Sequence, residues 1–189
     1  MNPELIHWTG PLGLPRFDLI RDEDFAPAFD ECLKLAGDAV ESIAANPEPP
    51  SFANTVAALE TAEEPLNRLC AIFFTLAGVD SNPTREALQR DIAPRLAAHG
   101  SRTSMDPRLF DRVEAIHQDR DELGPQDRRL TELTLRGLRR SGAGLTGAAR
   151  DRMAQIRERL AVLSTDFAQN VLTDERDYVL AVADDRLAG

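Results

Sequence analysis

Apolar residues recur every three or four positions along most of the chain, which is the spacing of one face of an α-helix. The spacing is clearest from residue 147 to residue 173, where it continues for about five turns. Capping residues followed by proline mark three further helix starts, at Asn82-Pro83, Asp106-Pro107 and Gly124-Pro125. Thr146 is a fourth plausible cap. The pattern therefore predicts a succession of helices along the chain.

These signals predict about six helices, over residues 22–45, 51–79, 83–104, 107–122, 125–140 and 147–173. Pro65 should kink or split the second helix, and Pro94 should kink the third. One strand candidate, residues 178–182, finds no partner elsewhere in the sequence. The predicted fold class is all-α, with antiparallel helices and one orphan C-terminal strand.

The domain organisation follows from the same pattern. Residues 1–17 are rich in proline and glycine and are expected to form an extended N-terminal arm. Residues 18–175 should form the helical domain, and residues 176–189 a strand or linker. The helix at 51–79 is apolar on more than one side, whereas a surface helix needs only a stripe about 100° wide. Either it is central to the bundle or its apolar face packs against a partner.

Composition narrows the class of protein. With 189 residues, 42% hydrophobic and 29% charged, the chain suits one globular domain. It has neither a run of 18 apolar residues nor a recognisable signal peptide, so a cytoplasmic location is expected. Cys32 and Cys70 lie in apolar helical surroundings, and buried free thiols are favoured over a disulfide.

The net charge is −10, and its distribution is uneven. Residues 18–64 contain twelve acidic and two basic residues, which accounts for the entire excess. This balance argues against nucleic acid and anionic membranes as partners. The acidic segment is either a solvated face or a surface that attracts cationic ligands.

The motifs that usually carry chemistry give no active site. Residues 142–147 satisfy G-x-G-x-x-G, but a helix precedes them where a dinucleotide site needs a strand. A helix-to-helix connector with Gly142 or Gly144 as left-handed cap is favoured. His7, His99 and His117 lack metal-ligand spacing, and H-E-x-x-H is absent. No catalytic or metal-ligating residue is therefore predicted.

Several segments carry a resemblance to a known family. They include Leu14-Pro15-Arg16-Phe17, the run from Asn46 to Thr55, the run from Ala93 to His99, and Gly142-Ala143-Gly144-Leu145. In order and spacing they resemble the N-terminal region of the thimet oligopeptidase-like zinc metallopeptidases. Within that family the chain is most similar to the bacterial peptidyl-dipeptidases, with oligopeptidase A as a near relative. The resemblance covers roughly residues 11–187.

The resemblance implies a neurolysin-like N-terminal helical domain that forms one wall of a substrate channel. In this family zinc is held by the histidines of H-E-x-x-H and a later glutamate, and no position here matches them. The chain alone is therefore expected to bind no cofactor and to be inactive, while the full-length parent is a zinc enzyme. Its expected partners are a C-terminal catalytic region of the same protein and short peptide substrates.

The resemblance also suggests site residues. Glu60, Glu63 and Glu64 would lie at the channel mouth and attract cationic or free-amine peptides. Interdomain contacts would be made by four residues, namely Phe73, Phe74, Tyr178 and Leu180. The alternative function, from another class, is a stand-alone helical module that binds a protein or peptide through the apolar face of the helix at 51–79.

Overall fold

A computed structural model describes residues 2–179 of the chain. Inside the last helix it leaves the side chains of certain positions undescribed, namely 154, 157, 158, 161, 162, 165, 166, 168, 169, 172, 173 and 175–177. The chain divides into two compact units, residues 1–144 and residues 145–189. Each unit is described by itself below.

The described part of the chain is helical and contains no strand, which confirms the all-α class. Its α-helices are α1 (Asp22–Ala44), α2 (Ala58–Ala62), α3 (Glu64–Val79), α4 (Pro83–Ser104), α5 (Pro107–Gln118), α6 (Pro125–Ser141) and α7 (Gly147–Asp177). Shorter turns are η1 (Pro3–Leu5), η2 (Pro11–Gly13), η3 (Phe17–Leu19), the π-helical η4 (Phe52–Ala57) and η5 (Arg120–Glu122). The predicted strand lies mostly outside the described residues, since only Tyr178 and Val179 of it are described.

Asn82 and Asp106 cap their helices through their side chains, whereas Gly124 and Thr146 occupy N-cap positions without a side-chain hydrogen bond. The Asn82 side chain accepts a hydrogen bond from the Arg85 amide at 2.9 Å, and the Asp106 side chain accepts one from the Arg108 amide at 2.8 Å. Each bond satisfies an amide that the helix itself leaves unpaired. Pro65 splits the predicted second helix as expected, because α2 ends at Ala62 and α3 begins at Glu64.

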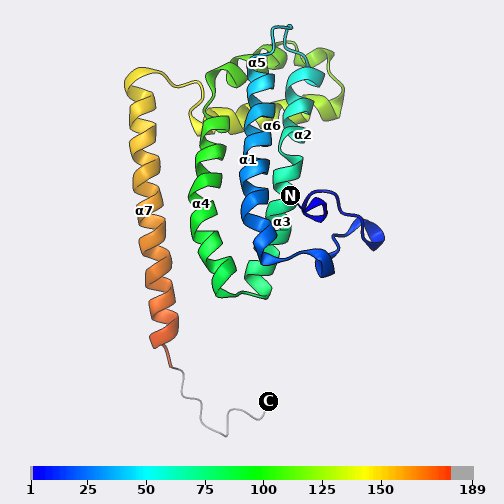
Figure 1. Cartoon of the computed structure of the whole chain (residues 1–189). Helices are drawn as coiled ribbons and strands as arrows, with labels where there is room; N and C mark the ends of the chain where they lie inside the picture. Colours follow the sequence, from blue (N-terminus) through cyan, green and yellow to red (C-terminus); the bar gives the residue numbers. More distant parts are fainter. Residues whose placement is uncertain (1, 180–189) are drawn as a thin grey trace, which may run out of the picture. The chain divides into compact units, whose positions relative to one another are not determined.

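The first unit places α1 between α4 and α3, with α5 and α6 across one end of these helices (Figure 1). Phe25 and Phe29 of α1 meet Phe73 of α3 edge to face, each at 5.2 Å between ring centroids. Such pairs add about 0.5–1.5 kcal/mol beyond the burial of their surface. Ile92 of α4 completes this core.

A second core lies at the end formed by η4, α5 and α6. Its buried members are Val56, Val113, Ile116, Leu135, Leu138 and Ala143. Between the two cores, Val40 and Ile43 of α1 pack with the fully buried Leu109 of α5. The single long helix α1 therefore contributes to packing at both ends of the unit.

The wide apolar face of α3 is covered within the first unit. Leu66, Leu69 and Phe73 are buried against α1, α4 and η1. This favours the interpretation that the helix is central to the bundle. The turn η1 belongs to the predicted arm, and its Leu5 is fully buried, so this part of the arm packs on α3.

The glycine-rich segment after α6 is a connector. Gly142 has φ of 91° and ends α6 as a left-handed cap, while the Ala143 amide donates to the Leu138 carbonyl at 3.1 Å. Gly144 lies against the Phe110 ring, where an added Cβ would be 3.0 Å from the nearest ring atom. A left-handed cap at Gly142 and close packing at Gly144 account for these two glycines, as expected for a connector.

The second unit contains α7, which extends four residues beyond its predicted end. Thr146 occupies its N-cap position. The predicted apolar stripe is present. Its first member, Met153, is partly buried, and five further members are more than a third exposed, namely Ile156, Leu160, Leu163, Phe167 and Val171.

Candidate functional site

The three candidate glutamates lie close in sequence but make different contacts. Glu60 is exposed on α2, while Glu63 occupies the break between α2 and α3. Glu64 begins α3 and forms an ion pair with Arg68 one turn later. Glu60 is therefore a solvent-exposed surface carboxylate, whereas Glu63 and Glu64 each contact another side chain.

Arg68 ties Glu64 to the N-terminal arm. Its guanidinium donates to the Ile6 carbonyl at 3.0 Å and lies 5.6 Å from the centre of the Trp8 ring. Stacking of a guanidinium on tryptophan contributes about 0.5–1 kcal/mol at an exposed site. The ion pair of Glu64 is thus part of the attachment between the arm and α3.

Glu63 instead contacts a buried histidine. Its Oε1 atom lies 2.7 Å from Nε2 of His99, a residue of α4. The His99 side chain is 6% exposed and the Glu63 side chain is 29% exposed. His99 continues the apolar stripe of α4, so the fold places an imidazole where the stripe would otherwise carry an apolar group.

Glu63 also lines a pocket of about 300 Å³ in the first unit. The pocket receives side chains from α1, α2, α4, α5 and α6. Four of the lining residues are apolar: Val40, Leu59, Leu109 and Leu138. The hydroxyl groups come from Thr103, Ser104, Thr134 and Ser141, and Gly137 leaves open space beside them.

The charge of this pocket is one-sided. Glu63 is the single ionisable group among its described lining residues. Thr103 and Ser104 belong to the last turn of α4, and Ser141 ends α6. Because the C-terminal end of a helix carries a partial negative charge, both helix ends add to the field of the carboxylate. The pocket is electrostatically suited to a cation and not to an anion.

The segment from Asn46 to Thr55 is held by a buried arginine. Arg112 of α5 donates to the carbonyls of Asn46 at 2.8 Å and Glu48 at 3.2 Å. It also donates to Asn54 Oδ1 at 3.0 Å and Thr55 Oγ1 at 3.1 Å. The residue is 8% exposed, and these four acceptors satisfy a charge that would otherwise be costly to bury.

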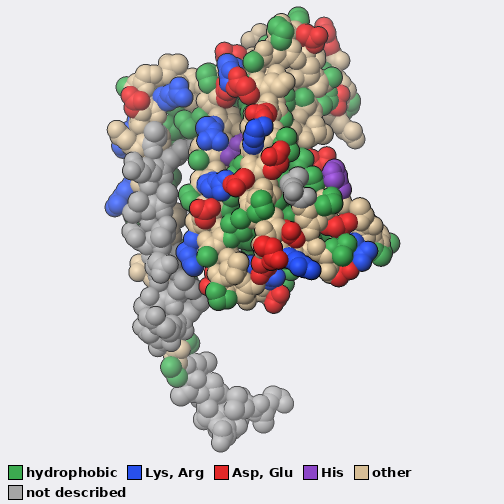
Figure 2. Space-filling view, in the orientation of Figure 1, with side chains coloured by type: hydrophobic (Ala, Val, Ile, Leu, Met, Phe, Trp, Pro, Cys, Tyr) green, Lys and Arg blue, Asp and Glu red, His purple; other side chains and the backbone are tan. Residues whose placement is uncertain are grey.

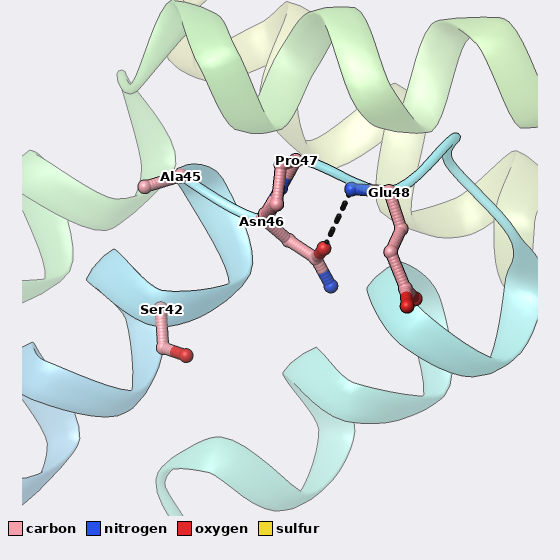
Figure 3. Close-up of a pocket in the computed structure, with 5 residues that line it drawn as sticks. All are labelled: Ser42, Ala45, Asn46, Pro47 and Glu48. Atoms are coloured by element: carbon pink, nitrogen blue, oxygen red, sulfur yellow. Dashed lines mark hydrogen bonds between the residues drawn. The ribbon is translucent and has the colours of Figure 1, made fainter.

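The same segment borders a surface depression at the end of α1 (Figure 3). Asn46 Oδ1 accepts a hydrogen bond from the Glu48 amide at 2.9 Å, which fixes the turn at Pro47. Ser51 and Asn54 then form reciprocal side-chain bonds to each other's amides at the start of η4. Local turns and Arg112 together give this loop one defined path.

The acidic residues of α1 are partly neutralised by arginines from other helices. Arg85 of α4 binds Asp22 at 2.7 Å, and Arg95 of α4 pairs with Asp30. Arg108 of α5 pairs with Glu41 at 2.7 Å. Figure 2 accordingly shows acidic and basic side chains interspersed on the visible face of the first unit. Part of the acidic excess therefore serves helix packing.

The four candidate interdomain residues have different environments. Phe73 is fully buried in the first core, whereas the Phe74 side chain beside it is 38% exposed. Tyr178, in the second unit, is 70% exposed. Leu180 lies outside the described residues. Phe74 and Tyr178 are thus the members of this set that present surface for a contact.

The described residues offer no ligand set for a zinc ion. Among the described residues, no three histidine, cysteine, aspartate or glutamate side chains cluster closely enough to hold a metal ion. The sequence also lacks H-E-x-x-H.

No described helix combines the length and apolar character that crossing a bilayer requires.

Two residues of the site, His99 and Arg112, had no predicted functional role. Their signals in the sequence are polar residues placed on apolar helix faces, His99 after Leu96 and Arg112 beside Val113. Such a position indicates a buried polar group that needs a partner. It does not indicate which partner, because the contacts join residues far apart in the chain.

The chain is homologous to the N-terminal part of a group of bacterial peptidases, which confirms the family resemblance. The dipeptidyl carboxypeptidase of Escherichia coli is 32% identical over 186 residues, and that of Salmonella typhimurium is 32% identical over 185 residues. Oligopeptidase A of Salmonella typhimurium is 27% identical over 190 residues. No protein-family model matches the chain.

The coverage of these matches is asymmetric. The match to the Escherichia coli dipeptidyl carboxypeptidase includes 97% of this chain but only 27% of that protein. For oligopeptidase A of Salmonella typhimurium the shares are 96% and 28%. The chain thus spans little more than a quarter of the length of the relatives it matches.

Proposed function

We propose that this chain is the non-catalytic N-terminal helical part of a cytoplasmic zinc peptidase that degrades short peptides. The observation that carries the proposal is the homology, which runs through nearly the whole chain yet covers about a quarter of each relative. A peptidyl-dipeptidase activity of the whole protein is favoured over that of an oligopeptidase, because identity to the dipeptidyl carboxypeptidases is higher.

The role of this part would be to form one wall of the substrate channel and to pack against the catalytic region. The exposed stripe on α7 supports the second role, because apolar residues such as Leu160 and Phe167 are costly to leave in water. Phe74 and Tyr178 supply further exposed aromatic surface. The zinc and its ligands would come from the catalytic region.

The alternative of a stand-alone interaction module has less support. That module was to bind its partner through the apolar face of the helix at 51–79. In the structure the large apolar residues of that face, such as Leu69 and Phe73, are buried inside the first unit. Phe74 is the exposed exception.

The gene itself tests the proposal. Translation beyond the codon for Gly189 should continue in frame and encode H-E-x-x-H, since that motif holds the zinc of such an enzyme and supplies its base. A reading frame that continues without this motif, or that stops, would contradict the proposal.

A second test uses the purified chain. Titration with zinc should give no stoichiometric tight binding, and a quenched-fluorescent peptide should remain uncleaved. The same assays on the whole protein should give zinc binding and cleavage. Activity of the isolated 189-residue chain would show that its chemistry had been assigned to the wrong region.

A further inference from the structure

The geometry points to a binding site for the free amino terminus of a short peptide with an apolar first residue, in the pocket that Glu63 lines. The identity of the ligand as a peptide rests on the proposed function. The site itself rests on the pocket and its charge, because a cavity of about 300 Å³ at the junction of five helices has a carboxylate in its wall.

The carboxylate is held in place. Its Oε1 atom is 2.7 Å from Nε2 of His99, and the imidazole is almost completely buried, so the contact fixes the orientation of the Glu63 side chain. The contact uses the Oε1 atom and leaves the second carboxylate oxygen of Glu63 for another donor. An oriented, half-buried carboxylate binds a cation more strongly than an exposed one such as Glu60, because water screens it less.

The described lining of the pocket adds acceptors and no arginine or lysine, while Arg102 and Arg140 lie in the last turns of α4 and α6 outside the lining. Thr103 and Ser104 lie at the negative end of α4, and Thr134 presents a hydroxyl from α6. A primary ammonium group has three N–H donors, which match a carboxylate and hydroxyl oxygens. Arg139, in the last turn of α6, is already paired with Glu114 at 2.9 Å.

The apolar side of the pocket selects the rest of the ligand. Val40, Leu59 and Leu109 provide a hydrophobic wall next to the carboxylate. The volume is at the low end for ligand pockets, which suits one amino-acid side chain. In an N-terminal residue the ammonium group and the side chain diverge from one carbon, so both walls can be contacted together. A lysine side chain places its charge at the end of a flexible four-carbon stem and matches less well.

The test is a titration of the ¹⁵N-labelled chain with leucinamide, followed by the amide signals of Thr134 and Gly137. We expect saturable shifts, and we expect binding to weaken about tenfold when Glu63→Gln removes the charge-assisted hydrogen bond. Glu63→Gln retains an acceptor for His99. Glu60→Gln is the matched control and should leave the affinity unchanged, since Glu60 does not line the pocket.

Two further arms distinguish the sources of the ligand and the location of the site. N-acetyl-leucinamide, which lacks the ammonium group, and Nα-acetyl-lysinamide should both bind at least about tenfold more weakly than leucinamide. Gly137→Leu should fill the pocket and abolish the shift of the Thr134 amide while the chain stays folded, because an added Cβ meets no atom within 4 Å.

Four results would overturn the inference. They are the absence of saturable shifts, equal affinity for N-acetyl-leucinamide, equal affinity of the Glu63→Gln variant, and tighter binding of the lysine derivative. None of these results tests whether the chain is part of a peptidase. The reading frame and the zinc titration test that proposal separately.

Discussion

Arg112 is the residue whose removal should most disturb the first unit without touching its apolar cores. It holds the Asn46–Thr55 segment, which carries part of the family resemblance, through four hydrogen bonds of 2.8–3.2 Å. The perturbation is Arg112→Met, which has a similar length and leaves the four acceptors without their donor.

The magnitude follows from the environment of each acceptor. Glu48 is exposed and Asn46 is partly buried, so water can replace part of the bonding to these two carbonyls after the substitution. Thr55 is fully buried, so its oxygen cannot do so without opening the structure. A hydrogen bond to a charged group contributes about 1.5–3 kcal/mol net. Because loss of the guanidinium also removes its desolvation cost, we expect a net loss of about 3 kcal/mol of unfolding free energy.

The assay is urea unfolding followed by tryptophan fluorescence. Trp8 is the single tryptophan and lies in the first unit, so the signal reports that unit. A loss of about 3 kcal/mol corresponds to a melting temperature lower by roughly 6–12 °C for a domain of this size. Arg136→Met is the matched control, since Arg136 is exposed on α6 and should cost less than about 0.5 kcal/mol. If the two variants were equally stable, the four hydrogen bonds of Arg112 would contribute nothing to the unfolding free energy.

Three other predictions test separate features of the structure. Gly37→Ala in the middle of α1 should raise the unfolding free energy by about 0.5–1 kcal/mol, because an added Cβ meets no atom within 4 Å; destabilisation in urea would refute the assigned packing. Burial raises the pKa of the Cys70 thiol to about 11, so Ellman's reagent should label the native chain slowly at pH 8. The unfolded chain should be labelled rapidly at both cysteines. Rapid labelling of the native chain would contradict this burial. The Arg108 side chain lowers the pKa of the Asp106 carboxyl, so this carboxylate stabilises the fold above its unfolded pKa of about 3.9, and that contribution is lost as the pH falls through the lower folded value. The variant Asp106→Asn keeps the cap and should therefore reduce the loss of unfolding free energy at acidic pH. An unchanged acid dependence would count against the ion pair.

Much of the fold was predictable because its signals are local. Asn82-Pro83 and Asp106-Pro107 begin helices through contacts within three residues, and Gly142 ends one through its own left-handed φ. Pro65 splits a helix because it lacks an amide proton. Pro94 lies inside α4, which continues from Pro83 to Ser104, and the kink expected there stays a prediction.

The candidate site was less predictable because it depends on contacts between distant residues. Glu63 and His99 are 36 residues apart, and Arg112 reaches partners 57 to 66 residues away. The acidic excess together with the family resemblance selected Glu60, Glu63 and Glu64, and only the fold distinguishes the pocket carboxylate from the exposed and the ion-paired one. Whether any of them lies at a channel mouth stays a prediction.

The central claim is that this chain serves as the N-terminal part of a peptidase, and a chimera tests it most directly. The chain would replace the matched N-terminal region of the Escherichia coli dipeptidyl carboxypeptidase, and cleavage of a quenched peptide would be measured. We predict that the chimera cleaves the peptide while the remainder of that enzyme, without an N-terminal region, does not. A folded chimera that stays inactive, although the enzyme's own N-terminal region restores cleavage, would contradict the claim.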